Sequence, residues 1–377
     1  MIRLSEFQAG IWQKQYQYKS FEPTFINTAW QIDVPEIILQ LSQADKKLGE
    51  LNAYSQLIPD VDFFIQMHVV KESTLSSKIE GTQTNIEQAV QRAEQIHPEQ
   101  RKDWQEVQNY IEAMNKSIVA LQNLPLSNRL IKQAHQILLQ GVRGEYKLPG
   151  EFRRSQNWIG GASLNDAIFI PPAPQNLDEL MSDFEKFLHN PETNLPPLLK
   201  IAIAHYQFET IHPFLDGNGR IGRLLITLFL VSENQLSKPT LYLSDFFEKH
   251  RNLYYDNLQR VRTHNDLEQW LKFFLQGVIT TSENAIRTFR NIIDMKEKNE
   301  NLITHLGKKH SKARKLLEFL YSKPVVEIAE VADYLQVEFS TASRLVKDFV
   351  QLQLLKETTN YKRNRQFIFQ EYLQLFS

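Results

Sequence analysis

The sequence predicts a mainly α-helical protein that also carries one β-hairpin and a small α+β unit at its C-terminus. Apolar residues recur at spacings of three and four through most of residues 35–149 and 177–292, which is the period of an amphipathic helix. Between these regions, the stretch 157–174 holds Gly-Gly, Asn-Asp and Pro-Pro among apolar residues, a pattern typical of a short hairpin. Beyond residue 309, short strand-like and helix-like runs alternate.

Composition limits the classes of protein that the chain can represent. Its 377 residues suggest two or three domains. The formal net charge is −1, so the chain as a whole is no polycation for nucleic acid, and the absence of cysteine excludes disulfides, thiol catalysis and cysteine-bound metal. No run approaches the ~18 apolar residues of a membrane span, and the start of the chain lacks the apolar core of a signal peptide. We therefore expect a cytoplasmic protein with no membrane partner.

The expected elements follow in order along the chain. Residues 1 to about 35 are expected to be irregular, and the proline inside the aromatic run YKSFEPTFI predicts an edge segment or an extended arm there. The apolar spacing then predicts successive helices, the first beginning near Pro35 and the others at about 61–80, 84–96, 101–121, 127–140, 177–189, 197–211, 219–233, 245–261 and 266–292. The chain divides into an N-terminal arm with helices at 1–60, a core at 61–290, a charged linker at 291–309 and a C-terminal domain at 310–377.

The C-terminal domain shows the order helix, strand, helix, turn, helix and hairpin, which is typical of a winged helix. Residues 308–377 hold 12 Lys/Arg against 8 Asp/Glu, a modest positive excess. DNA binding is therefore possible, with Lys362, Arg363 and Arg365 on the wing meeting phosphate. A domain that binds protein or packs on the core is the other open alternative.

The most informative stretch is HPFLDGNGRIGR at 212–223. Apolar spacing along residues 201–212 puts His212 on the inward face of a helix, and Pro213 prevents the residue before it from continuing in helical geometry. His212 thus lies at a helix end, beside a break. A lone histidine there would most simply be a buried side chain satisfied by a carbonyl group, but the residues that follow favour a functional role.

The next residues predict a site for a multiply charged anion. Three of the chain's 13 glycines fall within six positions of this stretch, and a glycine-rich loop before a helix lets backbone N–H groups converge on an anion. Arg220 and Arg223 lie in the first turn of that helix, where cations are disfavoured by ~0.3–1 kcal/mol each. A nucleotide polyphosphate would resolve this conflict, and Asp216 is suited to share Mg²⁺ with its phosphates.

The stretch resembles the signature of the Fic (Fido) family of protein adenylyltransferases, HPFxDGNGRxxR, and every fixed position matches. The resemblance covers roughly residues 60–290 and implies a helical core with a β-hairpin flap. It implies that His212 is the general base, which takes the proton from a target hydroxyl as that hydroxyl attacks the α-phosphate of ATP. It further implies that Asp216 holds Mg²⁺ and that Arg220 neutralises the distal phosphates. The remaining implied nucleotide contacts are Gly217, Asn218, Gly219, Ile221, Gly222 and Arg223.

Two further segments match the family. The hairpin at 157–174 resembles its flap, which pairs with an extended target segment by strand addition, although a purely structural hairpin is an alternative. Its residues nearest the base and sugar would be Asp166, Ala167, Ile168 and Phe169. Tyr254 and Tyr255 resemble a tyrosine pair beside the adenine, with core packing of a helix as the alternative. Some relatives have an asparagine that contacts the nucleotide seven residues beyond this pair; this chain has Arg262, which puts that contact in doubt.

The segment STLSSKIEGTQT at 73–84 resembles the family's inhibitory motif, [S/T]xxxE[G/N]. Ser76 and Glu80 lie at i, i+4 on one face of the helix at about 61–80, and Gly81 is a plausible C-cap. A carboxylate in a last helical turn has the wrong sign for the helix dipole, so Glu80 should seek a cation; taken alone, a surface glutamate would be the simpler interpretation. The resemblance implies that Glu80 borders the ATP site, pairs with Arg223 and makes ATP bind in an unproductive pose.

The leading hypothesis is therefore an autoinhibited adenylyltransferase that transfers AMP from Mg-ATP to a Ser, Thr or Tyr hydroxyl of a target protein, which could be the chain itself. One alternative is a Fic-type enzyme that moves another phosphate-containing group or removes AMP from a target. Another is a nucleotide-sensing regulator whose winged helix binds DNA, although His212 argues against pure sensing because holding phosphate requires no base. The sequence does not identify the protein substrate, and a homodimer is possible.

Overall fold

The chain is mainly helical, as its apolar spacing predicts. Within residues 1–57, 61–359 and 365–376, which the computed structural model describes, the strands form only three small sheets. None of the described helices combines the length and the apolar character that a membrane span requires. The predicted fold class is therefore confirmed.

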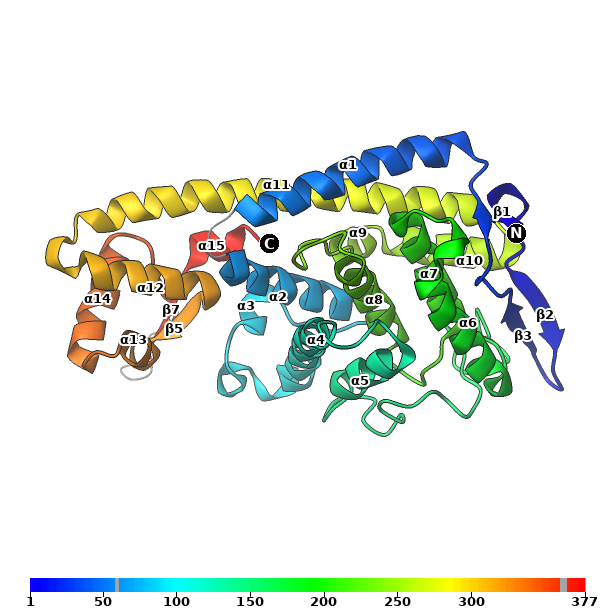
Figure 1. Ribbon diagram of the computed structural model, residues 1–377. Helices are drawn as coiled ribbons and strands as arrows, with labels where there is room; N and C mark the ends of the chain where they lie inside the picture. The colour runs from blue at the N-terminus through cyan, green and yellow to red at the C-terminus, as the bar shows by residue number, and fades with distance from the viewer. Residues whose placement is uncertain (58–60, 360–364, 377) are drawn as a thin grey trace.

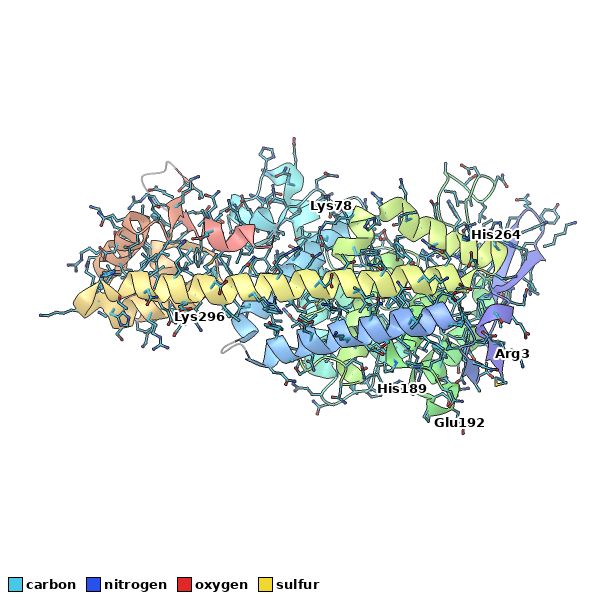
Figure 2. All side chains as sticks on the ribbon, turned by 90° about the horizontal axis from the view of Figure 1, so that it is seen from above. Arg3, Lys78, His189, Glu192, His264 and Lys296 are labelled. Atoms are coloured by element: carbon cyan, nitrogen blue, oxygen red, sulfur yellow. The ribbon has the colours of Figure 1, made fainter. Side chains whose placement is uncertain are left out.

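Two long helices run along one side of the molecule. Helix α1 (Pro35–Leu57) lies beside α11 (Leu267–Thr304), as Figures 1 and 2 show. The buried residues of α1 recur at spacings of three and four, from Ile37 to Leu51, which is the apolar stripe that such a contact requires. Helix α11 extends beyond α1 and reaches the C-terminal elements (Figure 1).

A pair of buried helices forms the centre of the remaining fold. Helices α7 (Pro197–Ile211) and α8 (Asn218–Ser232) pack against each other. Every residue of α7 from Leu198 onward is buried, as expected of a helix that is covered on all sides. The neighbouring helices are α2 (Val61–Ile79), α4 (Arg101–Ala120), α5 (Asn128–Leu138), α6 (Leu177–His189), α9 (Ser244–Lys249) and α10 (Arg251–His264).

Three helical segments differ from the predicted ones. The helix expected at 84–96 is a single turn, α3 (Ile86–Ala89), and the one expected at 245–261 breaks at His250 into α9 and α10. The charged segment 291–309, expected as a linker, continues α11 as far as Thr304. The physical reason is a buried stripe at helical spacing, hidden among the charges and formed by Ile292, Met295, Asn299 and Ile303.

The N-terminal segment is more ordered than expected, which corrects the prediction that residues 1–35 are irregular. Its strands are β1 (Ile2–Arg3), β2 (Gly10–Lys14), β3 (Lys19–Pro23) and β4 (Trp30–Gln31). Strands β2 and β3 form an antiparallel hairpin, and β1 pairs with β4 in parallel. Pro23 is the last residue of its strand, where a missing N–H disturbs the pairing little. The Phe21 N–H donates to the Ile170 carbonyl at 2.9 Å, so this hairpin also holds the end of the segment expected as the flap.

The C-terminal unit, residues 310–376, has the order of elements that the sequence predicts. These are α12 (His310–Ser322), β5 (Val325–Glu327), α13 (Ile328–Leu335), α14 (Phe339–Gln351), β6 (Lys356–Glu357), β7 (Gln366–Ile368) and α15 (Gln370–Gln374). The strands form one antiparallel sheet in the order β5-β7-β6. Of the three cations expected on the wing, Lys362 and Arg363 lie outside the described residues, and Arg365 pairs with Glu357 at 3.4 Å.

The C-terminal unit packs directly against α2. The rings of Phe64 and Tyr321 have centroids 5.2 Å apart, and those of His68 and Phe376 are 5.1 Å apart. Helix α2 therefore has one end in an aromatic contact with the C-terminal unit, while its other end points towards α8 (Figure 1).

Candidate active site at the start of α8

His212 directly follows the last residue of α7 and has a left-handed backbone, with φ 50° and ψ 59°. Its N–H still donates to the Phe208 carbonyl at 2.9 Å, so the helix ends in a closed turn. This conformation is uncommon for a residue with a side chain, and Pro213 disfavours the helical alternative. The position of His212 at a helix end agrees with the sequence prediction.

The His212 imidazole is partly buried, and its Nδ1 atom has no hydrogen-bond partner in the described part of the chain. Burial, together with the positive charges of Arg262 and Arg153, lowers the pKa of His212 to about 3. The ring is therefore neutral near pH 7, which is the form of an imidazole that can accept a proton. A general base needs this protonation state before the reaction begins.

The side chain of Asn218 closes the loop between His212 and α8. Its Oδ1 accepts from the Phe214 N–H and its Nδ2 donates to the Phe214 carbonyl, both at 2.8 Å. Gly217 has φ 77°, a left-handed conformation that glycine adopts readily. The Asn218 side chain thus shapes the loop, and the phosphate contact that the family resemblance implies for this residue stays a prediction.

Two carboxylates approach the first turn of α8 at positions where the chain has glycine. A Cβ atom at Gly219 would lie 2.3 Å from Oε1 of Glu80, and a Cβ atom at Gly222 would lie 2.2 Å from Oε1 of Glu209. A side chain at either position would displace a carboxylate. These glycines therefore admit acidic groups as well as opening the loop, whereas Ile221 between them is buried in the core.

Arg220 is buried and held by two acidic residues. Its Nη1 lies 2.9 Å from Oε2 of Glu106 in α4, and its Nη2 lies 3.5 Å from Oδ1 of Asp216. Glu106 has only 3% of its side chain exposed and also lies 3.7 Å from Arg143. The carboxylates of Glu106 and Asp216 thus hold the Arg220 guanidinium, which lies beside the loop where it was predicted to bind phosphate.

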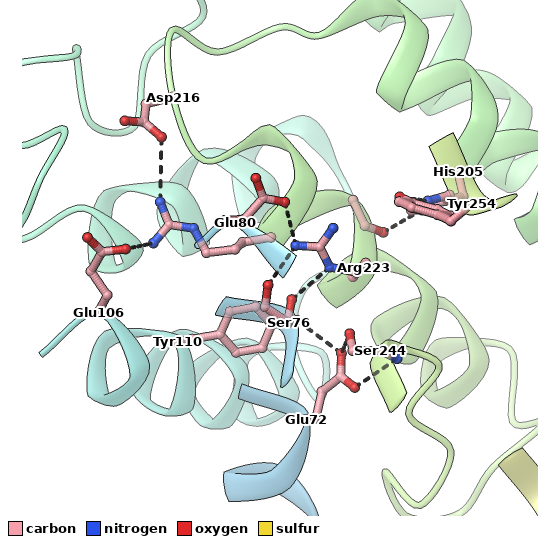
Figure 3. Close-up of polar contacts among 12 residues, drawn as sticks. Glu72, Ser76, Glu80, Glu106, Tyr110, His205, Asp216, Arg223, Ser244 and Tyr254 are labelled. Atoms are coloured by element: carbon pink, nitrogen blue, oxygen red, sulfur yellow. Dashed lines mark hydrogen bonds and ion pairs between the residues drawn. The ribbon is translucent and has the colours of Figure 1, made fainter. Parts of the chain in front are cut away.

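Arg223 is buried and bound to the end of α2 (Figure 3). Its Nε donates to Ser76 Oγ at 2.8 Å, and its Nη2 lies 2.9 Å from the Ser76 carbonyl and 2.7 Å from Oε1 of Glu80. Burial opposes ionisation of Glu80, but the charge and hydrogen bond of Arg223, with the charge of Arg220, outweigh burial and lower the Glu80 pKa. The ion pair implied by the inhibitory motif is therefore formed here.

The segment that resembles the inhibitory motif ends where the sequence predicts. Helix α2 stops at Ile79, and Glu80 lies in the turn that follows. Gly81 has φ 104° and donates its N–H to the Lys78 carbonyl at 3.0 Å. The Glu80 carboxylate thus projects from a helix end, with 30% of its side chain exposed.

Asp216 is the carboxylate best placed to hold a metal ion. About 30% of its side chain is exposed, and its carbonyl oxygen lies 2.9 Å from Nε2 of His135, which fixes the backbone at this point. Among the described residues, no group of three His, Asp or Glu side chains is arranged around a common metal position. Mg²⁺ bound with a nucleotide often takes only one or two carboxylates, because phosphate and water supply the other ligands. The donor set here fits that mode.

The segment expected as a hairpin at 157–174 is a loop closed by one bridge, between Ile159 and Phe169, which corrects the expected pair of strands. Asp166 folds its tip: its carboxylate accepts the N–H groups of Ala162 and Ser163, both at 2.7 Å. The side chain of Ile168 is 68% exposed, whereas Phe169 is buried. Ala167 is partly exposed. Of the four predicted flap contacts, Phe169 therefore faces the core and the other three lie at the surface.

The two tyrosines of α10 have different environments. Tyr254 is buried, and its hydroxyl lies 2.9 Å from Nε2 of His205, a contact that Figure 3 includes. Tyr255 is 39% exposed, and its ring centroid is 5.1 Å from that of Tyr254. Core packing, the alternative considered from the sequence, describes Tyr254, while Tyr255 keeps an accessible face.

Several charged residues around the site were not predicted from the sequence as part of it. Burial raises the pKa of Glu209 to about 7, and burial raises the pKa of Glu72 to about 7. Glu72 lies on α2 one i, i+4 step before Ser76, a spacing that could have drawn attention to it. Arg153 and Arg262 flank the end of α7; Arg153 follows a glycine-containing loop and carries no sequence signal of its own.

Comparison with known sequences places the site within two matching regions. Residues 38–119 match the description "Fic/DOC family N-terminal", and residues 125–230 match "Fic/DOC family". Over 125 residues, 33% of this chain, it is 38% identical to a protein adenylyltransferase Fic of Aedes aegypti, of which 22% is covered. Over 83 residues, 22% of this chain, it is 45% identical to the protein of that name from Drosophila melanogaster, of which 15% is covered. The matches thus span about a fifth of the curated relatives.

Solved structures support the same fold. A Fic family protein from Desulfovibrio desulfuricans G20 aligns with a TM-score of 0.57 and 20% identity, over 91% of this chain and 98% of the other. Fic-1 from C. elegans aligns with a TM-score of 0.52 and 20% identity, over 69% of this chain and 74% of the other. The first alignment covers most of the chain, so the overall arrangement, and not only the central helices, is shared with that protein.

Proposed function

This chain belongs to the Fic/DOC family, and from that premise we propose that it is an autoinhibited protein adenylyltransferase. It transfers AMP from ATP to a hydroxyl group of a protein substrate. The observation that carries the proposal is a neutral His212 imidazole, held at a helix end beside a loop that begins with Asp216 and leads to two buried arginines. Proton acceptance and anion binding are thus combined at one place, which a purely sensing site would not require.

The proposed reaction is a displacement at the α-phosphate of ATP. The target hydroxyl oxygen forms a bond to the α-phosphorus, the bond from that phosphorus to the oxygen bridging the β-phosphate breaks, and pyrophosphate leaves. His212 takes the hydroxyl proton. Asp216 would hold Mg²⁺, which supplies charge neutralisation at the phosphates when it is bound. Arg220 already contacts Glu106 and Asp216, so it reaches the distal phosphates only alongside or in exchange for these contacts.

Autoinhibition is the second part of the proposal. The Arg223 guanidinium is engaged by Ser76 and Glu80, and the Glu80 carboxylate stands within reach of the Gly219 position. A carboxylate at this place repels phosphate and keeps Arg223 from it. We propose that the γ-phosphate of ATP competes with Glu80 for Arg223, so that ATP takes the productive orientation only when Glu80 moves away.

For the C-terminal unit we propose a winged-helix domain that binds a partner protein or DNA. Its order of elements supports the winged helix, and its contact with α2 supports a role in the same regulation. The contact at Phe64 and His68 joins this unit to the helix that carries Glu80. Binding of a partner to the unit would then alter the position of α2. The target protein, including the chain itself as a target, is left open by this proposal.

The test uses the Glu80→Gly variant as the active parent, because the unaltered chain is expected to be slow. Labelled ATP is incubated with this parent and with the Glu80→Gly, His212→Ala double variant, and transfer to protein is followed. We expect transfer by the parent and a loss of about 10²–10⁴-fold on removing the base. ATP binding, measured by calorimetry, should persist in the double variant. Full transfer without His212 would contradict the assigned mechanism.

The mass added to the protein distinguishes the other Fic chemistries. An increase equal to AMP supports the proposal, whereas another phosphate-containing adduct would identify a different transferred group. Removal of AMP is tested by incubating the chain with a protein that already carries AMP. Release of AMP from that protein would identify the chain as the removing enzyme.

A further inference from the structure

We infer that Arg153 and Arg262 are positioning residues for the transfer reaction, and that they tie the end of α7, with His212, to the flap. The inference rests on the proposed function and deepens it. The two residues come from different parts of the chain: Arg153 lies in the loop after α5, and Arg262 lies in the last turn of α10. Both guanidinium groups nevertheless meet the same helix end.

The Arg153 side chain binds backbone carbonyls of two elements, the end of α7 and the flap. Its Nε donates to the His212 carbonyl at 3.0 Å, and its Nη2 lies 2.6 Å from the Pro172 carbonyl and 3.4 Å from that of Ile211. Its own N–H donates to the Pro213 carbonyl at 2.9 Å. The Arg153 side chain therefore contacts the carbonyls of Ile211 and His212 and the end of the flap together, and Asn157 Nδ2 also donates to the His212 carbonyl at 3.2 Å.

The surroundings of Arg153 are unusual for an arginine. Only 2% of the residue is exposed, and in the described part of the chain its side-chain hydrogen bonds all go to carbonyl groups. Buried arginines normally have a carboxylate partner. Here the compensation comes from the carbonyl end of α7, where four carbonyls lack helical partners and the helix dipole is negative. Burial lowers the pKa of Arg153 to about 10, which still leaves it charged at neutral pH.

Arg262 repeats this arrangement one turn away. Its Nη2 donates to the Glu209 carbonyl at 3.0 Å, and its Nε donates to Thr210 Oγ1 at 3.1 Å. Its guanidinium carbon lies 3.9 Å from the centroid of the Phe169 ring, which is a cation–π contact with the flap. Arg262 occupies the place where the family resemblance suggested a nucleotide contact, and it instead joins the same two elements as Arg153.

Two consequences follow for His212. Its left-handed backbone is held in place, so its imidazole keeps a fixed distance and direction to the bound nucleotide, and small displacements of such a group are costly for rate. The charged groups that act on its imidazole from the surrounding elements are Arg262 and Arg153, which disfavour the imidazolium, and Glu80, which favours it. The two arginines thus hold the base both in position and in its neutral form.

The test compares variants in the Glu80→Gly parent. Arg153→Lys keeps the charge, but the single nitrogen of an ammonium group cannot replace the three guanidinium nitrogens that reach four carbonyls, so we expect kcat to fall roughly 10- to 100-fold while KM for ATP changes little. Arg153→Met also removes the positive charge, so the pKa of His212 should rise. As the pH is lowered, the rate of Arg153→Met should therefore begin to fall at a higher pH than the rate of the parent. Arg153→Lys should keep the parental pH profile. Arg262→Lys is expected to show the same fall in kcat as Arg153→Lys.

The matched control is Arg154→Lys, because Arg154 is the neighbouring residue and is exposed; its kcat should equal that of the parent. Thermal unfolding and ATP affinity show which variants are folded, and a variant at either arginine suffices for the test. If the parent transfers AMP and folded Arg153→Lys or Arg262→Lys keeps its kcat, the inference is overturned. If the parent itself transfers nothing, the proposed function fails instead, so the two failures are distinguishable.

Discussion

Arg220 and Arg223 lie three residues apart on α8, are both buried, and each pair with a glutamate from another part of the chain. The glutamates differ in their anchorage. Glu106 lies within α4 and has 3% of its side chain exposed, whereas Glu80 follows the last residue of α2 and has 30% exposed. A partner held inside a helix can leave only if the helix moves, but a partner in a turn before a glycine can swing away. We therefore regard the first pair as structural and the second as a switch.

The pKa values of the two glutamates are shifted in opposite directions. Burial raises the pKa of Glu106, and the nearby charges of Arg220 and Arg143 do not overcome it. For Glu80, burial is opposed and outweighed by Arg223, so its pKa is lowered. Arg223 thus keeps Glu80 ionised, and the partial exposure of the carboxylate lets it exchange this arginine for water when ATP competes for the arginine.

The largest expected effect is a loss of unfolding free energy, and it should appear when the Glu106–Arg220 pair is broken. Glu106→Ala leaves the buried Arg220 with only the more distant Asp216 carboxylate, and breaking a buried pair costs about 3–5 kcal/mol. Glu80→Gly should cost much less, because Arg223 keeps its two bonds to Ser76. Denaturant unfolding of both variants measures the difference. Equal losses of unfolding free energy would mean that both pairs are structural.

The second largest expected effect is on the rate of AMP transfer, and it should appear when the Glu80–Arg223 pair is broken. Hydrogen bonds to charged groups contribute ~1.5–3 kcal/mol, so Glu80→Gly should raise AMP transfer roughly 10- to 100-fold. Arg223→Ala should not copy this gain, because it also removes a phosphate ligand, and the Glu80→Gly, Arg223→Ala double variant should stay slow. Transfer rates at saturating Mg-ATP decide the matter. A Glu80→Gly protein no faster than the unaltered chain would contradict the switch, while leaving the role of His212 untouched.

The Glu80 pair could be predicted from sequence, and the Glu106 pair could not. Glu80 belongs to a short motif with a serine at i−4 and a glycine after it, and the family resemblance of that motif implies its pairing with Arg223, 143 positions away. Glu106 and Arg220 are 114 positions apart, and neither segment carries a pattern that points to the other. The same holds for Arg153, whose partners are backbone carbonyls that any sequence would supply. Local periodicity likewise predicted the bounds of α6 and α7, because their apolar residues repeat without interruption.

Misplaced elements have a physical explanation as well. The continuation of α11 to Thr304 depends on a narrow buried stripe among many charges, which composition hides. The N-terminal hairpin depends on Phe21, which packs against Phe169 with ring centroids 5.8 Å apart. That contact joins residues distant in the chain, so strand propensity alone gave too weak a signal. The single bridge of the flap similarly reflects support from this hairpin rather than pairing within the flap.

A third carboxylate sharpens the comparison through pH. Glu72 lies on α2, eight residues before Glu80, but it accepts hydrogen bonds from Ser244 and Tyr110 and forms no ion pair with a cation of the described residues. Burial raises the pKa of Glu72 from 4.5 to about 7. The folded protein therefore holds this proton more tightly than the unfolded chain does. The stability that Glu72 contributes is complete below pH 4.5 and is lost as pH rises through 7.

Glu72→Gln should remove this loss. Between pH 5 and pH 8 the unaltered chain should lose at least ~1.4 kcal/mol of unfolding free energy relative to Glu72→Gln, the equivalent of one pKa unit. Glu80→Gln is the matched control, and its unfolding free energy should run parallel to that of the unaltered chain over this range, because the lowered Glu80 pKa places the pH dependence of that group below pH 4.5. Denaturant unfolding at several pH values provides the measurement. Parallel curves for Glu72→Gln and the unaltered chain would show that Glu72 is not protonated in the folded protein.

The smallest effect concerns Lys78, which lies on the last turn of α2 and faces solvent (Figure 2). Its Nζ is 2.8 Å from Oε1 of Glu248, and 53% of the Lys78 side chain is exposed. An exposed pair of this kind contributes ~0–1 kcal/mol and is weakened by salt. Lys78→Ala should therefore change AMP transfer by less than about twofold, in contrast to Glu80→Gly two positions further on. Transfer rates measured at low and high salt test this expectation. If Lys78→Ala activated the protein as strongly as Glu80→Gly, the exposed Lys78–Glu248 pair would be the contact that holds the end of α2. The Glu80–Arg223 pair would then not be the switch, and its contrast with the Glu106–Arg220 pair would be lost.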